Sequence, residues 1–308
     1  MRISTAYLFE TSVANLQKRQ QALTDTQSQL TSGKRVQQAS DDPAAAATAQ
    51  RAMLRAAQAD AQQRAVDASK NAMQQSESAL GNGVDLLQQA RALVVNAGNG
   101  SYTDADRASL AQQLKGLRDQ LFAVANSTDG NGRYLFGGQG SDQPPLLDAP
   151  GGVVYQGAPG QAQAASGQPM PLSIDGRAAW LQASDPNNPG ATVSVFGTLD
   201  KTIAALSTPG QTSAQVAQAV STGLAGIDAV SNNLSAWRSA AGAALNRADA
   251  MTAQISQTKL DATTQQSNAV DLDMVQAISN FQNQQTGYDA ALKTYSMVQQ
   301  MSLFQYLK

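Results

Sequence analysis

The two ends of the chain carry matching helix-pairing patterns, which constrain the fold more than any other feature. Near the N-terminus, alternating steps of four and three residues connect Phe9, Val13, Leu16, Gln20, Leu23, Gln27 and Leu30. Near the C-terminus, the same steps connect Met274, Ile278, Phe281, Gln285, Tyr288, Leu292 and Tyr295. Such steps place side chains on one face of an α-helix, and that face needs a partner. We predict that the chain folds back so that its ends pair.

The middle of the chain repeats this pattern at greater length. The longest run is Val216, Val220, Gly223, Ile227, Val230, Leu234, Trp237, Ala241, Ala244, Ala248, Met251, Ile255, Thr258 and Ala262. A shorter one is Leu110, Leu114, Leu117, Leu121 and Val124. Small residues at Ala61, Ala65, Ala68, Ala72 and Ala79 suggest a third, whose apolar face moves by one position beyond Ala79 to Leu80, Val84, Leu87 and Val94. Long paired helices are therefore expected, with a possible kink at Gly81 and Gly83 in the helix from Pro43 to about Asn96.

Several residues mark where these helices begin and end. Gly33 suits the left-handed conformation that closes a helix, and Asp42 before Pro43 suits a helix start. Capping is the simpler role for Asp41 and Asp42, because no further metal ligand lies nearby in the sequence. Thr103 and Asp106 resemble a capping box. Asp271 and Asp273 are expected to cap the last helix.

The composition changes in residues 129–197, which are rich in Gly, Pro, Gln and Ser. Short apolar pieces at residues 134–136, 152–155, 172–174 and 193–196 predict strands. The fold class predicted is mainly α: a long antiparallel coiled-coil rod formed by the N- and C-terminal arms, with a small β-rich domain inserted in the middle. The parts are an N-terminal assembly helix and connector (1–42), an outgoing arm (43–128), the insertion (129–197), a returning arm (198–268) and a C-terminal assembly helix (269–308).

Composition excludes several classes of function. The 308 residues include no cysteine and no histidine, so thiol chemistry and the commonest acid–base side chain are absent. We expect no enzyme activity, no metal and no cofactor. A net charge of -2 gives no field that would attract nucleic acid or an anionic membrane. We expect no cleavable signal peptide at the start, where hydroxyls and a carboxylate interrupt the apolar residues, and no membrane-spanning segment.

Two glycine-containing motifs are not nucleotide-binding loops. In the Gly33-Lys34 pair, Arg35 stands where a phosphate loop needs Ser or Thr. The glycines in residues 130–138 have no strand before them and no helix after them, so they indicate turns. The cations Lys34, Arg35, Arg238 and Arg247 are interpreted as solvated charges that could bridge to a neighbouring subunit in an assembly.

Four segments together resemble the flagellin superfamily. They are the opening MRIST, residues 31–36 (TSGKRV) with 40–45 (SDDPAA), residues 129–136 (DGNGRYLF) and residues 238–247 (RSAAGAALNR). The resemblance covers both helical arms, about three quarters of the chain, whereas the insertion matches only in position and size. The opening differs from the Asn-rich start that is usual in flagellins. This favours a junction member of the superfamily over a filament subunit.

The resemblance implies a secreted structural adaptor of the bacterial flagellum, exported in an unfolded state without cleavage of a signal. Its expected partners are the first hook-associated protein, flagellin, further copies of itself and a flagellar export chaperone. The expected assembly interface consists of Phe9, Val13, Leu16, Leu23, Leu30, Met274, Ile278, Phe281, Tyr288, Leu292 and Tyr295. Because glutamine interrupts these faces and little bulky core supports them, both ends are expected to be mobile in the monomer.

Three alternatives remain open at this point. A flagellin filament subunit would share the helical arms. A needle or tip protein of type III secretion would share the helical hairpin but would lack residues 31–45 as they stand here. An enzyme site in the insertion would depend on Asp142, Asp148, Asp175 and Asp185, without help from histidine, cysteine or glutamate.

Overall fold

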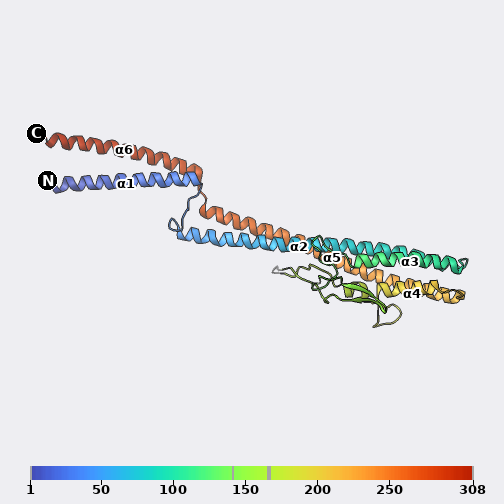
Figure 1. Ribbon diagram of the computed structural model, residues 1–308. Helices are drawn as coiled ribbons and strands as arrows, with labels where there is room; N and C mark the ends of the chain where they lie inside the picture. The colour runs from blue at the N-terminus through green and yellow to red at the C-terminus, as the bar shows by residue number, and fades with distance from the viewer. Residues whose placement is uncertain (1, 141, 165–167, 307–308) are drawn as a thin grey trace. The chain divides into compact units, whose positions relative to one another are not determined.

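Long helices dominate the computed structural model, which describes residues 2–140, 142–164 and 168–306 (Figure 1). The elements in order are α1 Arg2–Ser32, α2 Pro43–Ala97, α3 Asp104–Ala125, β1 Leu146–Ala149, β2 Gly152–Tyr155, the π-helical turn η1 Arg177–Leu181, β3 Ala183–Ser184, β4 Thr192–Val193, α4 Val195–Ser207, α5 Ser213–Val270 and α6 Met274–Tyr306. The predicted fold class is confirmed: mainly α, with a small β region in the middle.

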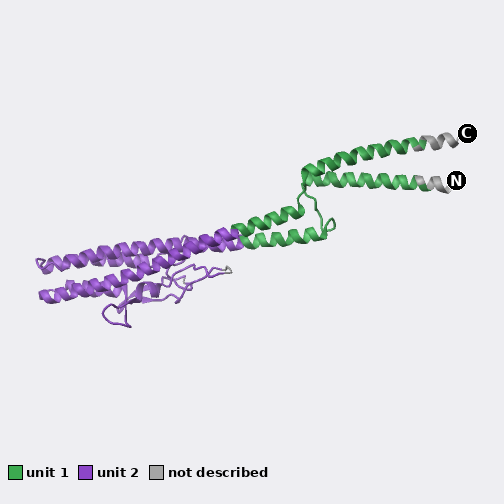
Figure 2. Ribbon diagram, turned by 180° about the vertical axis from the view of Figure 1, so that it is seen from behind, with its two compact units in different colours: residues 1–59, 256–308 green, residues 60–255 purple. Residues whose placement is uncertain are grey.

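The chain divides into two compact units (Figure 2). One comprises residues 1–59 and 256–308, and the other comprises residues 60–255. Helices α2 and α5 each run from one unit into the other, so each unit takes residues from both halves of the sequence.

The fourteen-residue pattern predicted in α5 is confirmed. Eleven of its members are buried, Trp237 and Met251 are partly buried, and only Thr258 is exposed. This pattern is the continuous apolar face of the returning helix. Within the second unit, ion pairs such as Lys70–Asp249 (2.6 Å) and Arg91–Asp228 (2.8 Å) join α2 to α5.

The alanine pattern predicted for α2 is only partly right: Ala72 and Ala79 are buried and Ala65 is partly buried, whereas Ala61 and Ala68 are exposed. In the second unit, the continuous buried face of α2 passes beside these alanines and consists of Val66, Ser69, Met73, Ser76, Leu80, Gly83, Leu87, Ala90, Val94 and Ala97. These residues alternate steps of three and four without a break. The part predicted beyond Ala79 agrees with it, since Leu80, Leu87 and Val94 are buried and Val84 is partly buried. The serine and glycine positions carry no apolar signal in the sequence.

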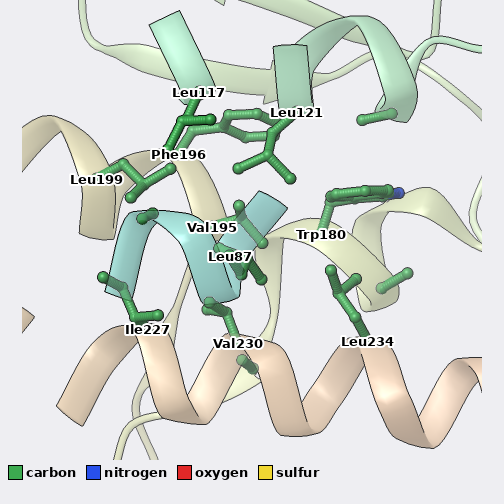
Figure 3. Close-up of a cluster of buried hydrophobic side chains, with 14 of the residues drawn as sticks. Leu87, Leu117, Leu121, Trp180, Val195, Phe196, Leu199, Ile227, Val230 and Leu234 are labelled. Atoms are coloured by element: carbon green, nitrogen blue, oxygen red, sulfur yellow. The ribbon is translucent and has the colours of Figure 1, made fainter. Parts of the chain in front are cut away.

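The expected kink in α2 does not interrupt the helix, which runs through Gly81 and Gly83. Gly83 instead allows close packing, since a Cβ there would lie 2.9 Å from the Trp180 ring and 3.3 Å from Leu234. Trp180 belongs to the core of the second unit, where α2, α3, α4 and α5 contribute side chains around it (Figure 3). Its ring packs edge-on against Phe136 at 5.3 Å and lies nearly parallel to that of Phe196 at 6.3 Å.

The insertion contains less strand than the sequence predicts. A hairpin of β1 and β2 pairs Leu146 with Tyr155, and β3 pairs with β4 over two residues each. The strand predicted at residues 193–196 is wrong beyond Val193: Ser194 caps a helix there, its hydroxyl accepting a hydrogen bond from Gly197 N–H (2.8 Å). Tyr134 and Pro171 take part only in isolated bridges. Loops therefore form most of this segment.

Arg118 of α3 fastens the hairpin to the helices. Its guanidinium donates to both carboxylate oxygens of Asp148 in β1 (2.6 and 2.8 Å) and to Asp200 in α4 (3.0 Å). The Phe122 and Phe196 rings lie 5.8 and 5.7 Å from the guanidinium carbon. Its hydrogen bonds hold the pKa of Asp148 below its ordinary value. One side chain therefore links three elements.

We predict that Arg118→Met lowers the free energy of unfolding of the second unit by about 2 kcal/mol, because two carboxylates lose charged hydrogen bonds while remaining half-exposed to water. The measurement is urea unfolding followed by tryptophan fluorescence, since Trp180 and Trp237 both belong to this unit. The control is Arg91→Met, whose partner Asp228 and own side chain are both 49% exposed. It is expected to cost less than about 1 kcal/mol.

The same pair of variants tests the sign of the pH dependence. The pKa of Asp148 is lower in the folded state than its unfolded value of about 3.9, so the ionised carboxylate stabilises the folded state above the unfolded pKa. This stabilisation is lost as the pH falls through the folded pKa. The difference between wild type and Arg118→Met should be constant above about pH 5 and shrink below about pH 4. A difference that grows on acidification would contradict the role of Asp148.

Candidate assembly interface

Helices α1 and α6 lie side by side and run antiparallel, as the terminal patterns predict (Figure 1). The rings of Phe9 and Tyr295 are 5.7 Å apart. Further along, the Thr26 hydroxyl lies 2.8 Å from the side-chain oxygen of Gln284 and donates to it. The two ends of the chain are thus partners within one molecule.

The predicted interface residues are unequally covered by this pairing. Val13, Leu16, Leu23, Leu30, Phe281, Tyr288 and Tyr295 are partly buried. Phe9, Met274, Ile278 and Leu292 remain 51%, 44%, 46% and 40% exposed. Among the side chains that the structure describes, α1 buries only Thr26 and α6 only Ala277. Four of the eleven predicted interface residues are therefore exposed in the single chain, and none of the eleven is fully buried.

The least exposed positions of α6 are shifted from those the sequence suggested. They include Ala277, Phe281, Gln284, Tyr288, Ala291 and Tyr295, again at steps of four and three. Half of them are the aromatic residues that the apolar pattern identified. The others are alanine and glutamine, which that pattern missed because small and polar residues carry no apolar signal. Ala277, Gln284 and Ala291 could have been predicted from their steps of three or four residues to the aromatic positions.

The connectors that follow α1 and α5 are hydrogen-bonded to each other. The N–H groups of Arg35 and Val36 donate to the carbonyl of Val270 (2.8 and 3.3 Å), and Leu272 N–H donates to the carbonyl of Gly33 (3.0 Å). Gly33 has φ +68°, which confirms its predicted left-handed conformation. Because both connectors are pinned at one place, α1 and α6 leave it as a pair.

Arg35 has partners within the chain, although its side chain stays 47% exposed as the sequence predicts for a solvated charge. Its guanidinium donates to the carbonyl of Ala269 (2.8 Å) and to the carboxylate of Asp42 (3.1 Å). Asp42 caps α2 as predicted, accepting from Ala45 N–H (3.0 Å). This backbone hydrogen bond, followed by that from Arg35, lowers the pKa of Asp42. Arg238 is likewise paired, with Glu77 at 2.6 Å.

Other predicted caps have the expected geometry. Thr103 and Asp106 form a reciprocal capping box at the start of α3. Asp273 accepts hydrogen bonds from the N–H groups of Val275 and Gln276 (3.0 and 3.1 Å) at the start of α6. Asp271 does not cap that helix; it accepts from the Ser267 hydroxyl at 2.5 Å. The aspartates near the ends of the helices thus have structural roles.

Metal-ligating side chains do not cluster in the described part of the chain. Within it, no group of three or more Asp, Glu, His or Cys side chains could hold a metal ion. Among the described residues, no helix combines the length and apolar character needed to cross a membrane. The surfaces of α1 and α6 are the candidate functional site because Phe9, Met274, Ile278 and Leu292 are exposed there.

Comparisons with known proteins place this architecture in a class. Residues 3–141 match the bacterial flagellin N-terminal helical region, and residues 224–307 match the bacterial flagellin C-terminal helical region. The class is thus the flagellin-like proteins, whose two helical regions come from opposite ends of the chain.

The similarity to one member of this class extends over the whole length. The chain is 35% identical to the flagellar hook-associated protein 3 of Salmonella typhimurium strain LT2, covering 99% of each sequence. It is 32% identical to the protein of that name from Escherichia coli K12, covering 100% of each. The chain belongs to the flagellar hook-associated protein 3 family.

Solved structures show the same fold. A putative flagellar hook-associated protein from Vibrio parahaemolyticus superposes with a TM-score of 0.67 at 23% identity. The match covers 75% of this chain and 100% of that one.

We predict that Gly33→Ala loosens the pinned connectors, because a residue with a Cβ pays about 1 kcal/mol or more in the left-handed region although space is available at this position. Amide hydrogen exchange in residues 29–42 should become about fivefold faster. Hydrogen exchange read by mass spectrometry of peptides from this region measures the effect.

The matched control is Gly116→Ala in α3, where an added Cβ also meets nothing within 4 Å but φ is negative. Alanine is the better helix former there, so α3 should exchange more slowly while residues 29–42 are unaffected. Equal exchange in wild type and Gly33→Ala would show that the turn does not depend on glycine.

Proposed function

We propose that this protein is a structural adaptor of the bacterial flagellum that joins the hook to the flagellin filament. The observation that carries this conclusion is the full-length similarity to flagellar hook-associated protein 3, at 35% identity over 99% of both chains. The fold supports it, because the long paired helices offer extended surfaces for neighbours.

Assembly in this proposal proceeds through the two terminal helices. Four apolar side chains of the predicted interface, Phe9, Met274, Ile278 and Leu292, stay at least 40% exposed. Burying them against neighbouring subunits would contribute about 25 cal/mol for each Å² removed from water. The partners are the first hook-associated protein on one side, flagellin on the other, and further copies of this chain around the junction.

The adaptor has to match two different mechanical elements. A hook bends, whereas a filament is stiffer, so a subunit between them must tolerate strain at one end without losing order at the other. The second unit has a large apolar core that would keep its order, whereas α1 and α6 bury few side chains and could adjust to their neighbours. The pinned connectors join the terminal pair to α2 and α5 within the first unit.

Export in an unfolded state fits the same features. The chain has no cysteine, so no disulfide could form before transport. Terminal helices with exposed apolar faces would need protection before assembly, and a flagellar export chaperone would supply it by covering the C-terminal helix. The final location is the hook–filament junction outside the cell.

Two rivals make different predictions for the same protein. A flagellin would share the matched terminal regions and would polymerise alone into long filaments. An enzyme would need its acidic insertion residues in one site. Asp148 is instead paired with Arg118, and Asp175 accepts hydrogen bonds from the N–H groups of Gly160 and Arg177. These contacts favour structural roles for both aspartates.

We predict that the purified protein binds to isolated hooks that already carry the first hook-associated protein, forms a short collar and stops. Flagellin added afterwards should then extend a filament. Electron microscopy of the hooks after each addition is the measurement. Long filaments before flagellin is added would make the protein a filament subunit, and absence of attachment would overturn the junction role.

We also predict that limited proteolysis of the monomer cuts first in residues up to about 33 and beyond about 268, because these helices have little tertiary support. Mass spectrometry identifies the cut sites, and residues 60–255 serve as the internal control. Protection of both ends in monomeric protein would contradict the idea that neighbours complete their packing.

A further inference from the structure

Three asparagine–glycine pairs occur in the chain: Asn82–Gly83, Asn99–Gly100 and Asn131–Gly132. In such a pair the backbone nitrogen of glycine can attack the side-chain carbonyl carbon of asparagine, because glycine has no side chain to obstruct the approach and adopts many backbone conformations. The reaction replaces the asparagine amide by a carboxylate. The sequence gives all three pairs this chemistry, whereas the structure places each in a different environment.

The first pair is held within a long helix. Asn82 and Gly83 lie in the interior of α2, where each N–H group donates to the carbonyl four residues earlier. Gly83 is also buried against the Trp180 ring. The attacking nitrogen is therefore engaged in the helix, and ring closure at this position would disrupt the core of the second unit.

The third pair is held in a hydrogen-bonded turn. Gly132 N–H donates to the carbonyl of Asp129 (3.1 Å), so the attacking nitrogen already has an acceptor. The N–H groups of Asn131 and Arg133 both donate to Oδ1 of Asp129 (2.8 and 2.9 Å). One carboxylate thus fixes the backbone on both sides of the glycine.

Asn99 and Gly100 lie in the exposed turn between α2 and α3. The side-chain oxygen of Asn99 accepts hydrogen bonds from the N–H group (3.1 Å) and the hydroxyl (3.0 Å) of Ser101. Both donors polarise the carbonyl group and would stabilise the negative charge that develops on its oxygen during the attack. Gly100 N–H has no acceptor among the described residues. This pair therefore combines a free nucleophile with an activated carbonyl.

We propose that Asn99 is a site of spontaneous deamidation and that Ser101 promotes the reaction through its two hydrogen bonds. The Gly100 nitrogen forms a bond to Cγ of Asn99, and its proton passes through water to the departing side-chain nitrogen, which leaves as ammonia. Water then opens the cyclic imide at either carbonyl carbon and leaves aspartate or isoaspartate at position 99. Water is the only co-reactant, and nothing is oxidised or reduced.

The reaction changes both the charge and the length of this turn. Helix α2 ends at Ala97, and a carboxylate two residues beyond it lies near the negative end of the helix dipole, where it is unfavourable. Isoaspartate also adds a methylene group to the backbone that leads to the capping box of Thr103 and Asp106. A subunit that is not replaced would accumulate this change with age.

The test is prolonged incubation of the purified full-length protein at mildly alkaline pH. Peptide mass spectrometry should detect a mass increase of about 1 Da at Asn99, at a rate at least about tenfold above the rates at Asn82 and Asn131. In denaturing urea the three rates should converge, because the folded environments that separate the pairs are lost. A faster reaction at Asn82 or Asn131 in the folded protein, or equal rates at all three, would overturn the proposal.

Two substitutions separate the nucleophile from the activating donors. Gly100→Ala should slow the reaction at Asn99 about tenfold by obstructing the attack, and the fold permits it because φ is not positive there and an added Cβ meets nothing within 4 Å. Ser101→Ala removes the hydroxyl donor but keeps the N–H donor, so the rate should fall about threefold. Ser101→Thr retains the hydroxyl and is the matched control, expected within about twofold of wild type.

The role of Ser101 depends on the folded turn, so the effect of Ser101→Ala should disappear in urea. Circular dichroism verifies that each variant retains its helices. A folded Ser101→Ala protein that reacts at Asn99 as fast as wild type would overturn the role of the Ser101 hydroxyl. Undiminished reaction in Gly100→Ala would show that the Gly100 nitrogen is not the nucleophile.

Discussion

The pairing of α2 with α5 is the interaction on which the rest of the second unit depends. In that unit each helix contributes a buried face at alternating steps of three and four, and ion pairs on the rim fix the register. Lys70 with Asp249 and Glu77 with Arg238 are both 2.6 Å apart. Exposed pairs of this kind add little stability individually. Their spacing along both helices nevertheless disfavours a shifted alignment of α2 and α5, because a shift would move the oppositely charged partners too far apart to pair.

Small residues let other elements pack onto this pair. A Cβ on Gly223 would lie 2.7 Å from Thr202, and one on Gly226 would lie 2.6 Å from Thr198, so α4 approaches α5 where side chains are missing. Gly83 similarly admits the Trp180 ring. The aromatic residues are few, and most of the large buried ones gather at this level of the core (Figure 3). This alanine-rich chain thus concentrates its large buried side chains in one region of the second unit.

The sequence predicted those features that depend on local spacing or capping. The α5 pattern, the Gly33 turn and the Thr103 capping box needed only residues close in the chain. The α2 face was predicted only in part, because Ser69, Ser76 and Gly83 occupy core positions. The insertion was poorly predicted because it is held by contacts between distant residues, such as Arg118 with Asp148. In the terminal pair, the aromatic half of the α6 face was recognisable, whereas its alanine and glutamine half depends on how closely α1 approaches.

The contrast between the helix pairs is itself an argument about function. A protein selected only for stability as a monomer would be expected to bury apolar side chains on every long helix. Here Val66, Leu80 and Leu87 of α2 are fully buried, whereas the described side chains of α1 and α6 include only Thr26 and Ala277 below one tenth exposure. Exposed apolar side chains on two paired helices are what an unfinished interface requires, because their burial becomes favourable when a neighbour covers them.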